Sequence, residues 1–224
     1  NIENFNTMDF IDLKAQQSRI REKIDKRVQS VLDHGKYIMG PEVFELEENL
    51  SKYVGMEYCI SCSSGTDALL IPLMAHEIGS GDAVITTPFT YIATAEVISL
   101  LGAEPVFVDI YDSTFNMDPD QIEGAIKYAE KKGLNTRAII PVDLFGLPSR
   151  YRIISELAKK HNLFILEDAA QGFGGEIRGQ KAGSFGDIAS TSFFPAKPLG
   201  CYGDGGAIFT NDEELAQKMR SIRI

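Results

Sequence analysis

The sequence has little positive charge, and this limits its partners. Its 224 residues include 22 Lys and Arg against 32 Asp and Glu, a formal net charge of −10 at pH 7. Nucleic-acid binding requires a basic face that displaces counterions from the phosphates, so we expect no nucleic-acid partner. A small anionic substrate held by a few local cations is compatible with this balance.

Long apolar runs are also missing. No segment approaches the roughly 20 apolar residues that cross a bilayer, and residues 1–10 lack the basic and then apolar order of a signal peptide. We therefore expect a cytoplasmic protein that does not enter a membrane.

Cysteine and histidine are scarce, with three of each. An odd number of cysteines does not suggest a disulfide framework. Cys59 and Cys62 form one C-x-x-C pair, but a second pair is missing and the histidines are scattered, so reduced thiols beside a buried strand are favoured and no metal is expected.

The apolar pattern predicts helices first and then alternating elements. A helix is expected over 10–34, and Pro41 opens a second one that ends at Gly55. Strands are expected at 58–61, 83–86, 104–109, 138–142, 163–166 and 207–210, with helices at 66–77, 94–101, 119–132 and 150–161 between them. Such repeats predict an α/β fold, a mostly parallel central sheet with helices on both faces. Ligands of these sheets bind beyond the carboxyl ends of the strands.

Two parts are expected along the chain: an N-terminal arm and helix at 1–35 and a large domain at 36–224. A further helix is expected after Asp212, and the sequence stops within it at Ile224. This suggests that a continuation is missing.

Two strand-to-helix junctions carry small or aromatic residues. Ser64, Gly65 and Thr66 open a predicted helix, where free N–H groups and hydroxyls suit a phosphate, although a plain helix cap is the alternative. Tyr91 follows another strand, where its ring could stack on a flat ligand or pack in the core.

Two further junctions carry charge. Glu167 and Asp168 end an apolar strand, and alternation turns them to opposite sides, so at most one faces a ligand. Lys197 lies between two prolines and ahead of a glycine-rich turn, with the hydroxyl of Ser192 nearby. A phosphate site, a stacking ring, a carboxylate and a fixed lysine meet the needs of pyridoxal phosphate, which requires a Schiff-base lysine and a partner for its ring nitrogen.

Three motifs carry a resemblance to a known family: 64–69 (SGTDAL), 167–171 (EDAAQ) and 192–200 (SFFPAKPLG). Together they resemble the sugar-nucleotide aminotransferases of the DegT/DnrJ/EryC1/StrS family, and the likeness runs from about Met8 to Ile224. The resemblance implies the large domain of a fold-type I transferase dependent on pyridoxal phosphate. It also implies that the smaller C-terminal domain of the family is absent from this chain.

The resemblance implies roles for single residues. Lys197 falls on the lysine that binds the cofactor covalently, and Asp168 on the carboxylate that faces its ring nitrogen. The other cofactor-binding positions are Ser64, Gly65 and Thr66 with Ser192 at the phosphate, Tyr91 on the ring, and Gln171 near the phenolic oxygen.

The implied reaction moves an amino group from glutamate to a nucleotide-linked keto-sugar, in a homodimer with shared active sites. The 193–206 wording looks most like members that aminate C3 of UDP-2-acetamido-2-deoxy-3-oxo-glucuronate, for surface polysaccharide such as lipopolysaccharide. Amination at C4 or of a dTDP-keto-sugar is an alternative, and so is a non-catalytic, pyridoxal-phosphate-binding regulator. A related sugar dehydratase is disfavoured, because it resembles a histidine at the position of Lys197.

Overall fold

The computed structural model describes residues 11–223 of the chain. The first ten residues of the expected N-terminal arm lie outside the described residues. Contacts along the chain define two compact units, Asn1–Phe44 and Glu45–Ile224. Each is described by itself below, and the expected boundary after residue 35 stays a prediction.

The first unit contains helix α1, Leu13–His34, and the start of helix α2, Pro41–Val54. The Asp12 carboxylate caps α1 by accepting from the Ala15 N–H at 2.8 Å, and Gly35 ends it with a φ of 67°, a conformation that glycine adopts without strain. Proline stands at the first position of α2, as expected.

The second unit is built on a seven-stranded sheet in the order β1-β9-β8-β5-β4-β2-β3. Its strands are β1 Tyr58–Cys62, β2 Asp82–Thr86, β3 Glu104–Phe107, β4 Asn135–Ile139, β5 Phe164–Asp168, β8 Ile188–Ser192 and β9 Gly206–Thr210. Only β9 runs against its neighbours β1 and β8, and the other neighbouring strands are parallel. The expected mostly parallel sheet is therefore confirmed.

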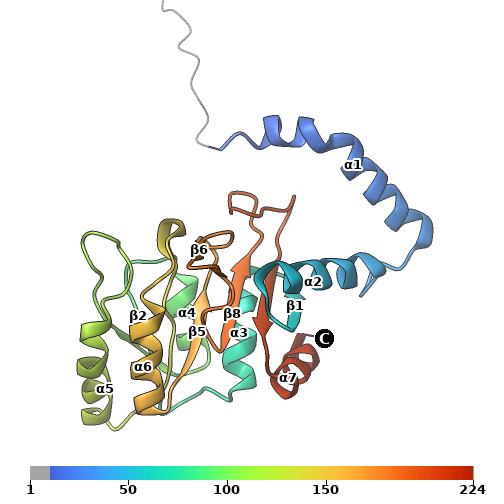
Figure 1. Ribbon diagram of the computed structural model, residues 1–224. Coiled ribbons are helices and arrows are strands. Elements are labelled where there is room, and N and C mark those ends of the chain that lie inside the picture. Colours follow the sequence, from blue (N-terminus) through green and yellow to red (C-terminus); the bar gives the residue numbers. More distant parts are fainter. Residues whose placement is uncertain (1–10, 224) are drawn as a thin grey trace, which may run out of the picture. The chain divides into compact units, whose positions relative to one another are not determined.

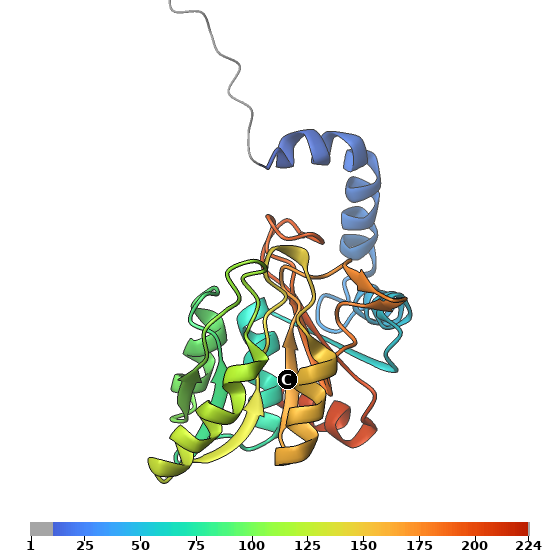
Figure 2. The same cartoon turned by 60° about the vertical axis from the view of Figure 1, so that its left-hand side comes forward.

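Helices cover both faces of this sheet (Figures 1 and 2). On one face lie α3 Gly65–Ala75, α4 Ala93–Leu100 and α7 Glu213–Arg223; on the other lie α5 Ile122–Lys131, α6 Tyr151–His161 and the end of α2. Strand β2 shows why: Val84 packs under α3 and α4, while Ala83 and Ile85 pack under α5. The continuous apolar strands are buried from both sides.

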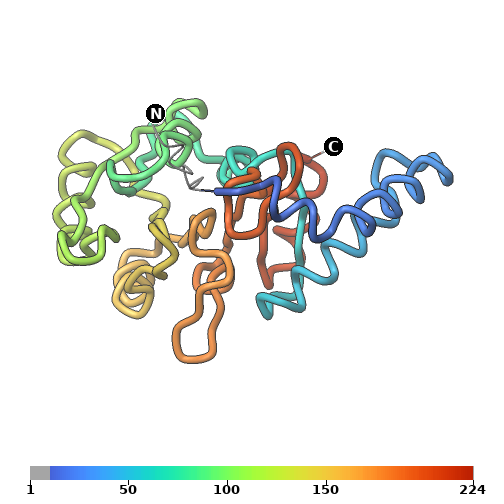
Figure 3. The backbone as a smooth tube through the Cα atoms, turned by 90° about the horizontal axis from the view of Figure 1, so that it is seen from above, coloured from blue at the N-terminus to red at the C-terminus, as the bar shows by residue number. Residues whose placement is uncertain are grey.

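Short elements complete the loops: the 3-10 turns η1 Pro119–Gln121 and η2 Leu144–Gly146, and the hairpin of β6 Glu176–Ile177 and β7 Gln180–Lys181. Seen from above in Figure 3, this orange hairpin projects outward from the sheet. The long loop between β8 and β9 rises beyond the sheet at the top of Figure 1.

Strand β4 lies three residues earlier than the apolar pattern predicts, because the expected segment 138–142 includes Pro141. A proline has no N–H to donate to a sheet ladder. Beyond Ile139 the pairing continues as single hydrogen bonds, from Ile140 N to Ile85 O at 2.8 Å and from Asp168 N to Pro141 O at 3.0 Å. The chain therefore stays beside β5 and delivers Asp143 to the carboxyl edge.

Among the described helices, none combines the length and the apolar character needed to span a bilayer. The described residues also contain no group of three or more His, Cys, Asp or Glu side chains able to hold a metal ion. Cys59, Cys62 and Cys201 are free thiols, and burial raises the pKa of Cys62 to about 12.

Candidate active site

The predicted site residues come from loops at one edge of the sheet. Strands β1, β2, β5 and β8 run in the same direction, so the turns that follow them emerge at a common edge. These turns supply Ser64 after β1, Tyr91 after β2, Gln171 after β5 and Lys197 after β8.

The start of α3 lies against the end of β8. A Cβ on Gly65 would come within 2.5 Å of Ser192 Cβ, so only glycine allows this approach. Ser64 Oγ accepts from the Asp67 N–H at 3.0 Å and is therefore a helix cap, the plainer of the two sequence interpretations. The N–H groups of Gly65 and Thr66 have no acceptor within the described residues. A capped helix start with two such N–H groups remains suited to an anion.

Asp168 is a buried carboxylate at the end of β5, 4% exposed. Its Oδ2 accepts from the Thr94 hydroxyl at 2.9 Å, and its Oδ1 accepts from the Ala170 N–H at 3.2 Å. Burial raises the pKa of Asp168 above its ordinary value, and the two hydrogen bonds and the positive charge of Lys197 oppose that rise. The group is thus desolvated yet equipped to hold a negative charge.

Lys197 lies in the loop that connects β8 to β9. Its N–H donates to Phe194 O at 2.8 Å, and the loop is closed by hydrogen bonds from Phe193 N to Gly205 O at 2.7 Å and from Cys201 N to Phe193 O at 2.8 Å. The lysine is half-buried, and its charge acts on Asp168. The loop therefore holds one amine over one buried carboxylate.

Tyr91 and Gln171 are placed less tightly. The Tyr91 side chain is 68% exposed, so it is not part of the core, and its carbonyl accepts from the Thr94 N–H. Gln171 Oε1 accepts from the Phe145 N–H at 2.9 Å, which holds the loop after β4. Neither contact shows what the phenol ring or the amide Nε2 binds.

The residues present fit pyridoxal phosphate. Asp168 lies in an apolar interior, where a carboxylate calls for a positive partner, and a protonated ring nitrogen is one. The Gly65 and Thr66 N–H groups with the adjacent Ser192 offer donors to a phosphate.

Three buried side chains at this edge were not singled out from the sequence. Thr94 is 1% exposed and contacts Asp168 directly; Asp143 and Tyr151 lie behind it, at 0% and 5%. A threonine in the first turn of a helix and an aspartate after an apolar strand were the available signals. Neither signal names a partner that lies far away in the sequence.

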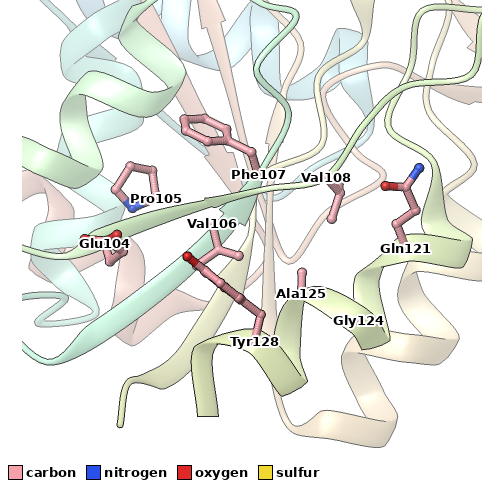
Figure 4. A pocket seen from close by; sticks show the side chains of 9 residues that line it. All are labelled: Glu104, Pro105, Val106, Phe107, Val108, Gln121, Gly124, Ala125 and Tyr128. Atoms are coloured by element: carbon pink, nitrogen blue, oxygen red, sulfur yellow. The ribbon is translucent and has the colours of Figure 1, made fainter. Parts of the chain in front are cut away.

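A separate groove of about 650 Å3 lies between the edge strand β3 and helix α5 (Figure 4). Val106, Phe107, Gln121 and Tyr128 are among the residues that line it. None of the predicted site residues belongs to it, and its lining lacks a lysine or arginine. The groove is therefore distinct from the edge that carries Lys197.

A seven-stranded, mostly parallel sheet with a lysine over a buried aspartate at its carboxyl edge defines the large domain of a fold-type I transferase. Residues 18–224 match the DegT/DnrJ/EryC1/StrS aminotransferase family, and the chain belongs to this family of pyridoxal-phosphate-dependent sugar aminotransferases.

Relatives of known name agree with this assignment. The chain is 54% identical to a UDP-2-acetamido-2-deoxy-3-oxo-D-glucuronate aminotransferase of Pseudomonas aeruginosa, over 96% of this chain and 58% of the relative. It is 45% identical to a pleiotropic regulatory protein of Geobacillus stearothermophilus, over 96% of this chain and 56% of that protein. A crystal structure of a family aminotransferase from Brucella abortus superposes with a TM-score of 0.94 at 53% identity, over 96% of this chain and 58% of that one. The chain thus spans between half and two thirds of the length of these relatives.

Proposed function

We propose that the full-length protein transfers the amino group of glutamate to a keto-sugar carried by a nucleotide, using pyridoxal phosphate. The observation that carries this proposal is Lys197, held over the buried Asp168 beside the helix start at Gly65. An amine, a ring-nitrogen partner and a phosphate site are the three groups that the cofactor requires.

Each residue has a task in this proposal. The N–H groups of Gly65 and Thr66, with Ser64 and Ser192, bind the phosphate; Tyr91 stacks on the ring; Gln171 lies at the phenolic oxygen. When bound, the cofactor supplies a carbonyl for the incoming amine and a ring that accepts electrons. Asp168, kept anionic by the Thr94 hydroxyl and the Ala170 N–H, holds a proton on the ring nitrogen.

Lys197 then acts through its Nζ. Displaced from the cofactor by the substrate amine, the ε-amine accepts the proton from the α-carbon of glutamate as a general base and later returns it as a general acid. The loop closure at Phe194 and Gly205 keeps Nζ near that carbon.

The proposed acceptor is C3 of UDP-2-acetamido-2-deoxy-3-oxo-glucuronate, leading to an amino sugar for surface polysaccharide. The 54% identity to a protein named for that sugar supports this choice. A C4 or dTDP-linked keto-sugar is the alternative acceptor, since much of the lysine loop wording is shared among relatives.

A non-catalytic regulator is the second candidate, favoured by the 45% identity to a protein named as regulatory. Both candidates would bind the cofactor through Lys197, so cofactor binding does not distinguish them. Only amino transfer does.

The test is a panel of nucleotide keto-sugars offered to the full-length protein with glutamate. We expect 2-oxoglutarate to form fastest with the UDP-linked 3-oxo-glucuronate. Faster turnover of a C4 or dTDP sugar would replace the substrate assignment. A cofactor absorbance band without transfer to any sugar would contradict the enzyme and favour the regulator.

We further propose a homodimer with active sites shared between subunits. Its test mixes two inactive full-length variants, one altered at Lys197 and one at a partner-facing residue outside this chain. Activity recovered in the mixture would support sharing. The cytoplasm is proposed as the compartment, because the three cysteines are free thiols.

A further inference from the structure

Two carboxyl groups face each other behind Asp168. Asp143, at the carboxyl end of the β4 segment, and Glu167, next to Asp168 in β5, are both 0% exposed. Their side chains are in hydrogen-bonding contact with each other. Two like charges at such a buried contact repel strongly, so one of the groups must carry a proton.

The hydrogen bonds assign that proton. Glu167 Oε1 accepts from the Gly183 N–H at 2.5 Å, and Oε2 accepts from the Phe185 and Gly186 N–H groups at 2.6 and 3.2 Å. Three backbone donors stabilise the ionised form of Glu167.

The two oxygens of Asp143 differ from each other. Oδ1 accepts from the Ser149 N–H at 2.9 Å and from the Tyr151 hydroxyl at 2.7 Å. Oδ2 has no donor among the described residues. An acceptor without a donor is costly in the interior, whereas a protonated Oδ2 would donate to Glu167 and leave every polar atom of the pair satisfied.

The surroundings favour one negative charge for the pair. Tyr151 of α6 and Asp168 at the end of β5 are the other titratable groups at this position, and the turn 183–186 contributes backbone N–H groups. Burial and the charge of Glu167 raise the pKa of Asp143 well above its ordinary value, in agreement with the hydrogen bonds.

We propose that Asp143 is a neutral carboxylic acid that donates its Oδ2 proton to Glu167, and that this shared proton positions Asp168. The Asp143 N–H donates to Asp168 O at 3.0 Å, and a Cβ on Gly172, in the turn after Asp168, would come within 2.5 Å of Asp143 Cβ. Asp143 thus holds the backbone on which the Asp168 carboxylate depends. The role of Asp168 rests on the proposed function; the shared proton does not.

The direct test is infrared difference spectroscopy on the full-length holoprotein near neutral pH. Asp143→Asn keeps an acceptor at Oδ1 and a donor toward Glu167. We expect the wild-type spectrum to contain a C=O stretching band of a neutral carboxylic acid that Asp143→Asn lacks. The exposed Asp112 provides the matched control, because Asp112→Asn should remove only a carboxylate band.

Stability against pH gives a second measurement. A folded-state pKa above the unfolded value stabilises the protein at low pH, and this contribution disappears as the pH rises through the folded pKa. We expect wild-type and Asp112→Asn melting temperatures to fall at alkaline pH more than that of Asp143→Asn.

A third measurement tests positioning. Asp143→Asn should bind pyridoxal phosphate within about twofold of the wild type, while Glu167→Gln, which turns an amide N–H toward the backbone donors, should bind it at least roughly tenfold more weakly. An unchanged carboxylic-acid band in Asp143→Asn, or failure of this variant to fold, would overturn the shared proton. Full tolerance of Glu167→Gln would place the proton on Glu167 instead. Loss of amino transfer alone would concern the proposed function, since the infrared band does not depend on it.

Discussion

Replacing Gly65 by alanine tests the close approach of helix α3 to strand β8. The new Cβ would lie 2.5 Å from Ser192 Cβ and 2.8 Å from its Oγ, whereas ordinary contacts begin at 3.4 Å. Helix and strand must therefore separate by about 0.9 Å, the difference between 3.4 and 2.5 Å. This movement would displace the N–H groups that we assign to the phosphate.

The magnitude follows from two opposing terms. Overpacking a tight contact costs about 1–3 kcal/mol, and alanine in place of glycine returns at most about 1 kcal/mol in a helix. We expect a net loss of about 1–2 kcal/mol, which lowers the melting temperature of a chain of this size by roughly 2–8 °C. Affinity for pyridoxal phosphate should fall in parallel.

Gly124 provides the matched control. It lies in α5 with no atom within 4 Å of an added Cβ, so Gly124→Ala should gain stability from helix propensity alone. Thermal melting and absorbance titration of the full-length variants give the two quantities. Adding Ser192→Gly to Gly65→Ala should recover melting temperature, because the clashing atoms are gone. A Gly65→Ala protein as stable as Gly124→Ala, with unchanged cofactor affinity, would refute the close approach.

Three further predictions concern single side chains. Borohydride reduction should attach the cofactor to the wild-type protein irreversibly but not to Lys197→Ala, as intact mass will show; attachment in the variant would place the reactive amine elsewhere. Thr94→Val removes the hydroxyl that donates to Asp168 and should weaken cofactor binding by roughly 10–100-fold, while Thr94→Ser should not. Burial lowers the pKa of His76, which stacks on Phe164 at 3.8 Å, so the unfolded chain binds the proton more tightly and stability should fall as the pH drops below about 6.5. His76→Phe should flatten that acid slope, and an unchanged slope would assign it to another group.

Local patterns in the sequence predicted much of the fold. Pro41 marked the start of α2, and the alternation through Ala83, Val84 and Ile85 marked a strand covered on both faces. The end of β4 could not be placed as well, because Pro141 belongs to an apolar segment that lies along the sheet but cannot donate to it.

The site divides in the same way. Lys197 and Asp168 stand out because a charged residue in a constrained loop or at the end of a buried strand is unusual. Thr94 and Asp143 do not, because a threonine or an aspartate after a strand is common in any turn. Their partners lie far away in the sequence, so their roles emerge only when the sheet brings β2, β4 and β5 together.

The antiparallel direction of β9 has a mechanical consequence for the lysine. The loop 193–205 leaves the sheet at Ser192 and re-enters it at Gly206, and these two residues are paired in register. A Cβ on Gly206 would come within 2.3 Å of Ser64 O, just as one on Gly65 would meet Ser192. Both ends of the loop are thus fastened to the phosphate turn by backbone contacts. A slip of β9 by one residue would move one anchor by about 3.3 Å, whereas side-chain changes within the loop leave both anchors in place. The loop should therefore accept sequence variation that alters reactivity without displacing the amine.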